Sequence, residues 1–289
     1  MKKTTSFIWA FLFMAIVACS SKSGEPIVRI KTNYGNLKLK LYNETPVHRD
    51  NFLKLAKEGY FNGTLFHRVI KNFMIQGGDP DSKNAQGGVA LGQGGPGYTL
   101  PAEIDYPKFF HKKGALAAAR EGDRQNPERR SSGSQFYIVQ GEISNDSKLT
   151  KLENKFREDK KREIFNQVLA QYEDSLNTLQ QLGDQDSMMD MQKFVMGEVQ
   201  KQYAAQPEFT MPERVKEIYK TRGGTPHLDG GYTVFGEVIE DKTLFEQIAS
   251  LFGRRYGLEV IERIAQEQTD GRNRPLKDVV ILDVKVIRE

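Results

Sequence analysis

Glycine is spread unevenly along this 289-residue chain, and its distribution separates two kinds of structure. Sixteen of the 26 glycines precede residue 142, whereas two lie between residues 142 and 222. A glycine inside a helix is about 1 kcal/mol less favourable than an alanine. The middle of the chain is therefore expected to be helical, and the flanks are expected to consist of strands and turns.

The flanks contain short apolar runs typical of strands. Residues 27–41 alternate in polarity around the turn Asn33-Tyr34-Gly35-Asn36, which predicts a β-hairpin. Thr45-Pro46 then predicts the start of a short helix that ends near Lys57. Further strands are expected at residues 65–70, 73–76, 115–119, 135–139, 233–238 and 279–287. Many short strands with few helices indicate a closed barrel or a sandwich.

The middle of the chain has helical periodicity. Neither Gly nor Pro occurs from 142 to 182, and apolar residues recur there at Ile164, Val168, Tyr172, Leu176, Leu179 and Leu182. A single amphipathic helix of this length would reach about 50 Å, so it is expected to project from the body. Two uses remain open: a packing appendage, or a surface that binds client or partner proteins.

The N-terminus has the pattern of an export signal. Lys2-Lys3 precede an apolar run from Phe7 to Ala18, which falls short of the ~20 residues that span a bilayer. Residues 1–18 are expected to be a signal peptide. Ile16-Val17-Ala18-Cys19 resembles the lipobox of bacterial lipoproteins, which implies an acylated Cys19 and a tether over residues 19–26. The alternative is an unmodified cysteine after an ordinary signal. We expect an exported protein, lipid-anchored to a bacterial membrane and facing the periplasm.

Several classes of function are disfavoured. The formal net charge is +4 with both signs interspersed, so a nucleic-acid partner is not expected. The four histidines include no helical zinc pair, and Lys83 stands where a calcium loop needs a ligand. Residues 92–97 match G-x-G-x-x-G, but the sequence after them cannot begin a helix. We expect neither a metal nor a cofactor.

One motif stands out, because residues 66–79 (FHRVIKNFMIQGGD) interleave a cation and an amide with large apolar side chains. This segment closely resembles the central motif of cyclophilins. The resemblance continues, in the family's order, at residues 114–120 (GALAAAR), 133–138 (GSQFYI) and 228–236 (LDGGYTVFG). It covers nearly all of residues 27–141 and 223–289, with residues 142–222 as a helical insertion.

The resemblance implies a mainly β fold: a closed eight-stranded antiparallel barrel with two capping helices, the second of them around residues 243–250. It also implies a peptidyl-prolyl cis-trans isomerase that takes proline-containing polypeptides as clients. His227 stands where well-known members have the Trp that binds cyclosporin, so affinity for that drug is expected to be weak.

The chemistry of such an enzyme follows from the amide bond, whose rotation barrier is about 18–20 kcal/mol because nitrogen donates its lone pair into the carbonyl. A permanently charged donor such as Arg68, aimed at the prolyl nitrogen, would stabilise the twisted amide without moving a proton. By resemblance the catalytic residues are Arg68, Gln76 and His67, although a structural role for His67 is an open alternative. The resemblance implies these substrate-binding residues: Phe73, Met74, Ala119, Arg120, Gln135, Tyr137, His227, Leu228 and Tyr232.

Three functions remain in competition. The first is a lipid-anchored folding enzyme. The second is a proline-binding module with little turnover whose helical insertion acts as a chaperone or assembly scaffold. The third is a barrel that carries a small apolar ligand, which Arg68 and Gln76 within the motif disfavour. Under the first hypothesis, deleting residues 149–222 is expected to leave the turnover of short peptides largely intact.

Overall fold

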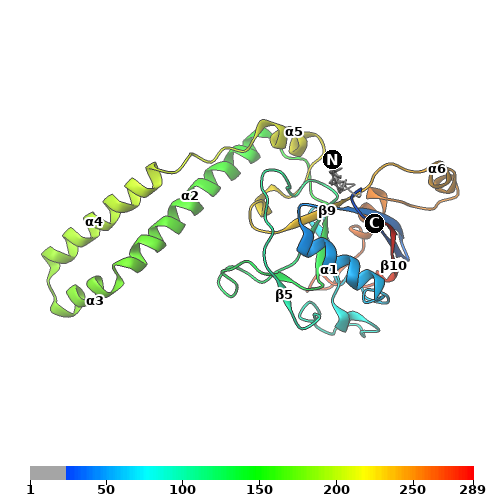
Figure 1. Ribbon diagram of the computed structural model, residues 1–289, viewed down its shortest axis with the longest axis horizontal. Coiled ribbons are helices and arrows are strands. Elements are labelled where there is room, and N and C mark those ends of the chain that lie inside the picture. The colour runs from blue at the N-terminus through cyan, green and yellow to red at the C-terminus, as the bar shows by residue number, and fades with distance from the viewer. Residues whose placement is uncertain (1–23) are drawn as a thin grey trace, which may run out of the picture.

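The computed structural model describes residues 24–289, and its body is a curled antiparallel sheet with helices against it (Figure 1). The predicted signal peptide, Cys19 and most of its tether lie outside the described residues. Within residues 24–289, no helix has the length and apolar character that crossing a membrane requires.

The main sheet has eight strands in the order β10-β1-β2-β9-β6-β8-β4-β3, and β5 pairs with β7 beside it. The predicted hairpin is confirmed, since Ile30 pairs with Leu37 and Val28 with Leu39, all four fully buried on one face. The strands are β1 (Ile27–Thr32), β2 (Gly35–Leu41), β3 (Arg68–Ile70), β4 (Met74–Gly77), β5 (Thr99–Leu100), β6 (Ala115–Ala118), β7 (Ser131–Ser132), β8 (Phe136–Val139), β9 (Val234–Val238) and β10 (Ile281–Arg288).

The sheet does not close into a barrel, which corrects the expectation of a closed one. Its outer strands β3 and β10 are not paired with each other. The segment before β3 meets the start of β10 instead, through the bridge between Leu65 and Val280 and backbone hydrogen bonds such as that from Ile281 N–H to the carbonyl of Thr64 at 2.8 Å. β3 is three residues long, and the N–H of its central residue, Val69, donates to the carbonyl of Asn273 in a loop at 2.8 Å. That amide is therefore unavailable to a neighbouring strand.

Two helices cover the sheet, but the second is not the predicted one. Phe52 and Leu55 of α1 and Val260 and Ile264 of α7 are buried in the same core as the sheet. The segment expected to form the second cap is α6, which buries only Glu246 and Ala249. The helices are α1 (Pro46–Lys57), η1 (Pro80–Ser82), α2 (Asp146–Gln171), α3 (Glu173–Leu182), α4 (Gln185–Ala204), α5 (Glu213–Thr221), η2 (Pro226–Leu228), α6 (Leu244–Leu251) and α7 (Leu258–Ile264).

The helical arm, which we define as α2, α3 and α4, extends away from the sheet (Figure 1). The single long helix that periodicity predicted is broken at Tyr172, where α2 ends and α3 begins. α4 packs back on α2 through a small core of Ile164, Val168, Val195 and Val199. With the arm included, helices hold more residues than strands, so "mainly β" describes the body and not the whole chain.

The root of the arm is part of the body. Leu149 at the start of α2 is buried with Val215 and Tyr219 of α5 and with Phe110 of the body. The chain leaves and returns at one point, where the amides of Glu142 and Gly224 donate to each other's carbonyls at 3.2 and 3.1 Å. The helices that interrupt the sheet sequence are therefore fixed to the body at their base.

Candidate functional site

A cavity of about 100 Å³ opens where β3, β4 and β8 meet the segment after η2. We call it the proline cavity. Nine of the predicted site residues line it: Arg68, Phe73, Met74, Gln76, Ala119, Arg120, Tyr137, Leu228 and Tyr232. Residues separated by up to 164 positions thus form one wall, because β4 pairs with both β3 and β8.

A chain of hydrogen bonds orders the polar side of the cavity. Arg68 lies opposite Gln76 in the β3–β4 register, and its Nη1 donates to Gln76 Oε1 at 3.2 Å. The amide of Gln76 donates to Gln135 Oε1 at 3.0 Å. Gln135 in turn donates to the carbonyls of Gly92 and Gly94 at 2.9 and 2.8 Å. The glycine-rich loop therefore fixes Gln135, which orients Gln76 toward Arg68.

The charge of Arg68 is not neutralised by a neighbour. Burial lowers the pKa of its half-buried guanidinium, and no carboxylate lies within ion-pair distance of it among residues 24–289. A guanidinium remains protonated even after such a shift. The cavity thus presents a permanent cation with unused N–H donors, in surroundings where charge interactions are stronger than in water.

The other walls are apolar. Met74 and Tyr137, on paired strands β4 and β8, pack with Phe73 and Leu228 in one cluster. The ring of Tyr232 meets that of Tyr137 edge-on at 5.9 Å. Burial raises the pKa of the Tyr137 phenol well above its usual value, so the hydroxyl stays protonated. A ring the size of proline would meet aromatic and aliphatic carbon here.

Behind the cavity lies a buried polar network that the sequence did not reveal. His111 Nε2 lies 2.9 Å from the Tyr137 hydroxyl, and His111 Nδ1 lies 2.9 Å from Asp229 Oδ1. The hydroxyl of Tyr219, from α5, donates to Asp229 Oδ2 at 2.7 Å. Asp229 belongs to the motif at residues 228–236, but no sequence signal connects Tyr219 to it. The network holds Tyr137 in place from behind.

Arg120 flanks the cavity and is held by its own surroundings. Its Nε donates to the carbonyl of Gly231 at 2.7 Å, and its guanidinium lies 4.5 Å from the centre of the Tyr232 ring. It also pairs with Asp123 at 2.6 Å. Arg120 therefore fixes Tyr232 beside the cavity, and the carboxylate of Asp123 offsets much of the charge that Arg120 would present to a ligand.

Two predicted histidines lie outside the cavity lining. His227 is adjacent to it, with its ring stacked on Phe73 at 5.4 Å. His67 is 4% exposed. It precedes Arg68 and, in an extended chain, points to the opposite side. The structure does not bring His67 to the site, which favours the structural alternative.

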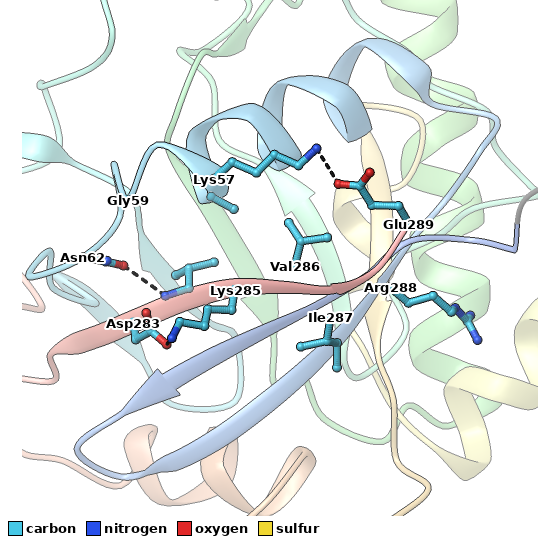
Figure 2. A pocket seen from close by; sticks show the side chains of 11 residues that line it. Lys57, Gly59, Asn62, Asp283, Lys285, Val286, Ile287, Arg288 and Glu289 are labelled. Atoms are coloured by element: carbon cyan, nitrogen blue, oxygen red, sulfur yellow. Dashed lines mark hydrogen bonds and ion pairs between the residues drawn. The ribbon is translucent and has the colours of Figure 1, made fainter.

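A separate hollow of about 570 Å³ lies between α1 and β10 (Figure 2) and includes none of the predicted residues. Charged side chains that line this hollow form ion pairs with one another: Lys57 pairs with Glu289, and Lys285 pairs with Asp283. No group of three His, Cys, Asp or Glu residues in the described part of the chain is arranged to hold a metal ion. The proline cavity, in contrast, is lined by nine of the predicted site residues.

Known proteins that are similar in sequence to this chain include several named as peptidyl-prolyl cis-trans isomerases. Residues 27–204 match the family model described as cyclophilin type peptidyl-prolyl cis-trans isomerase/CLD. A candidate peptidyl-prolyl cis-trans isomerase of Staphylococcus aureus (strain USA300) is 30% identical over 268 residues, covering 92% of this chain and 93% of the relative. The corresponding protein of Staphylococcus saprophyticus is 29% identical over 259 residues, covering 89% of each chain.

Two further matches differ in extent. A candidate bifunctional phosphatase/peptidyl-prolyl cis-trans isomerase of Streptococcus pyogenes is 30% identical over 263 residues, which cover 90% of this chain but 38% of that longer protein. A cyclophilin of Cryptosporidium parvum of known structure superposes with a TM-score of 0.48 at 22% identity, covering 92% of this chain and 99% of its own. The family-model match and the Staphylococcus aureus relative show that this chain belongs to the cyclophilin-type peptidyl-prolyl cis-trans isomerase family.

Proposed function

We propose that Arg68 accelerates rotation about X-Pro bonds by stabilising the twisted amide. When the bond twists, the nitrogen regains its lone pair and becomes a hydrogen-bond acceptor. The guanidinium of Arg68 is a permanent donor with no carboxylate beside it in the described part of the chain, and it lines the same cavity as the apolar side chains. It would bind this nitrogen more strongly in the transition state than in the planar ground state, which is the condition for catalysis.

In this proposal the other residues of the cavity bind the proline ring or orient Arg68. Phe73, Met74, Tyr137 and Leu228 would hold the proline ring, so that the preceding carbonyl rotates against a fixed ring. Gln76 would orient Arg68 through their hydrogen bond, and Gln135 would fix Gln76. No covalent intermediate and no proton transfer enters the reaction.

The observation that carries this proposal is the uncompensated charge of Arg68 beside the apolar wall. Its test is turnover of a succinyl-Ala-Xaa-Pro-Phe peptide by purified residues 20–289. We expect Arg68→Ala to lower kcat/KM by about 10²–10³, the effect of removing one oriented donor to a developing charge. Arg68→Lys keeps the charge but loses the planar fork, so partial activity is expected. Equal activity of the wild type and Arg68→Ala would exclude this mechanism.

We also propose that the clients are exported polypeptides, met at a bacterial membrane. The support is the sequence of residues 1–23: a basic start, a short apolar run, and Cys19 in a lipobox-like context followed by a polar tether. Mass spectrometry of protein isolated from membranes is expected to show acyl chains on an N-terminal Cys19. A mature N-terminus at another residue, without acyl chains, would contradict the anchor.

A second candidate function, chaperone-like binding of client chains by the helical arm, has one observation in its favour. Leu182, Met189, Phe194 and Met196 of the arm are each more than half exposed. Exposed methionines and aromatics suit adaptable contacts with unfolded chains. Suppression of aggregation of an unfolded protein by Arg68→Ala would support this function independently of turnover.

A further inference from the structure

A second cavity, of about 270 Å³, adjoins the proline cavity on the side of His227. Its walls are the base of α2, the segment 224–227, Asn72 and Glu142. His227 lines it, and the His227 ring stacks on Phe73, which lines the proline cavity. The ring centres are 5.4 Å apart, less than the roughly 7 Å that two extended residues span. The two cavities are therefore separated by this pair of stacked rings, and we expect a peptide in the proline cavity to reach the second cavity within about two residues.

Three lysines and one acidic residue, Glu142, line this second cavity, so its wall is basic on balance. Lys148, Lys151 and Lys155 of α2 all line it, because residues at i, i+3 and i+7 share one helix face. Lys148 pairs with Glu142, whereas neither Lys151 nor Lys155 has an ion pair within the described residues. Burial is the main cause that lowers the pKa of His227, followed by the charges of His111 and Lys155. The positive charge of this wall therefore extends to His227, next to the proline cavity. Leu152 provides an apolar surface between the lysines.

We propose that this lysine cavity binds an acidic side chain of the client, about two residues from the proline that is isomerised. The methylene groups of a glutamate would contact Leu152, and its carboxylate would reach Lys151 and Lys155. The helical insertion would thereby select X-Pro bonds with an acidic neighbour. This inference rests on the proposed function, because the same peptide must occupy both cavities.

The test compares two peptides that differ by one charge, with Glu or Gln two residues before or two residues after an Ala-Pro pair. Catalysed exchange is measured by NMR on the purified full chain. We expect kcat/KM to be about three- to ten-fold higher with Glu than with Gln at one of the two positions, as expected for solvent-exposed ion pairs. The preference is expected to shrink as salt rises.

Charge reversal supplies the decisive comparison. Lys151→Glu/Lys155→Glu is expected to abolish the preference for Glu, whereas Lys160→Glu/Lys161→Glu, farther along α2, is expected to retain it. Equal rates for Glu and Gln at both positions, or a preference that survives Lys151→Glu/Lys155→Glu, would overturn the proposal. If no peptide is turned over, the proposed function fails separately, and fluorescence titration of the same peptides still decides whether the cavity prefers Glu.

A different observation concerns α6, whose outer face is apolar and exposed. Leu244, Phe245, Ile248, Leu251 and Phe252 have exposed fractions of 72, 69, 49, 83 and 83%. The helix is nevertheless well fixed, because Thr243 and Glu246 form a capping box and Lys38 pairs with Glu246 at 2.8 Å. A contiguous exposed apolar face on a stable helix is typical of an interaction surface.

The surroundings of α6 indicate what covers this face. Arg254 and Arg255 follow it, are exposed and have no ion pair among the described residues. Glu25, at the start of the described chain, pairs with Lys40 at 3.3 Å, and Lys40 lies on the same face of β2 as Lys38. The start of the described chain and α6 are therefore both tied to β2, through Lys40 and Lys38. Five residues lie between Cys19 and Glu25 in the sequence, and the six steps from one to the other span at most roughly 20 Å.

We infer that α6 lies in the surface of a lipid bilayer containing anionic lipids, with its apolar face among the acyl chains and Arg254 and Arg255 at the headgroups. This orientation would hold the body against the membrane to which Cys19 is proposed to be attached. Acylation of Cys19 is read separately by mass spectrometry, so failure of the anchor is distinguishable from failure of this inference.

A tryptophan reporter tests the inference, since Trp9 in the predicted signal peptide is the only tryptophan of the chain. Phe252→Trp is compared with Phe194→Trp on the helical arm, each as processed full chain on phosphatidylglycerol/phosphatidylcholine vesicles. Brominated acyl chains are expected to quench the indole at position 252 and not the one at position 194. Equal quenching at both positions, or no quenching at 252, would overturn the inference.

Discussion

The hydroxyl of Tyr219 donates a hydrogen bond of 2.7 Å to the buried carboxylate of Asp229, although Tyr219 belongs to the inserted helices and Asp229 to the body. Asp229 also accepts from His111, which contacts the hydroxyl of Tyr137 in the proline cavity. The insertion therefore completes the support of the site. Without Tyr219, one oxygen of a buried carboxylate would lose its partner.

Tyr219→Phe removes that single hydrogen bond while leaving the ring. We expect the free energy of unfolding to fall by about 1.5–3 kcal/mol, because the acceptor is a buried charged group. A smaller loss of kcat/KM should follow, since Tyr137 is then less firmly held. Urea unfolding and peptide turnover measure the two effects. Tyr203→Phe, in the helical arm, is the matched control and should change neither; equal unfolding midpoints for the two variants would contradict the network.

Deletions within the insertion should separate its two parts. Replacing residues 160–204 by a short Gly-Ser linker removes the core of Ile164, Val168, Val195 and Val199 but keeps Leu149 and Tyr219. Turnover of a short neutral peptide is expected to remain within about two-fold of the wild type. Deleting residues 149–222 removes Tyr219 and is expected to destabilise the body, contrary to the expectation from sequence. The two deletions are compared by thermal unfolding and by turnover. Equal melting temperatures and equal turnover in both variants would contradict the claim that only the base of the insertion supports the site.

The fold was predictable where local patterns and pairing agree. The alternation of residues 27–41 predicted the β1–β2 hairpin, and the glycine-poor middle predicted helices. Closure of the sheet was not predictable, because it depends on whether Val69 bonds a strand or the loop carbonyl of Asn273. The choice between α6 and α7 as the cap also lies beyond local pattern: both are apolar, and only tertiary packing decides that Val260 and Ile264 are buried.

The site was predictable to the extent that motif residues alternate along strands. Arg68 and Gln76 face the same side because β3 and β4 pair in register, and the motif contains both. His67 does not line the proline cavity, because adjacent residues of an extended segment point to opposite sides. Tyr219 was missed because a long-range hydrogen bond from a helix leaves no periodic signal.

The link between Arg68 and Gln76 predicts strong coupling between their substitutions. Gln76→Ala is expected to lower kcat/KM by about ten-fold, because a hydrogen bond that orients a charged group is lost. In the Arg68→Ala background the same change should have less than about a two-fold effect, since residues that act together are non-additive. Gln125→Ala, in an exposed loop, is the control. Additive losses in the double variant would mean that Gln76 acts on the peptide directly.

His67 predicts a pH dependence of stability rather than of catalysis. Burial lowers the pKa of His67 below the usual 6.5 and outweighs the opposing effects of Asp79 and the backbone of Leu65. As pH falls through 6.5 the unfolded chain takes up a proton that the folded chain does not, so stability is lost on acidification. The loss approaches roughly 1.4 kcal/mol per pH unit for one such group. Burial also lowers the pKa of His48, which adds to this loss of stability on acidification.

His67→Phe should therefore reduce the slope of unfolding free energy against pH between 7.5 and 5.5, measured by urea unfolding at several pH values. Since the His67 ring does not line the proline cavity, kcat/KM at pH 7.5 should stay within about two-fold of the wild type. An unchanged slope would show that His67 titrates alike in both states. A ten-fold loss of kcat/KM with unchanged stability would instead return His67 to the catalytic role that the motif implied, because only contact with the peptide or with Arg68 would then account for it.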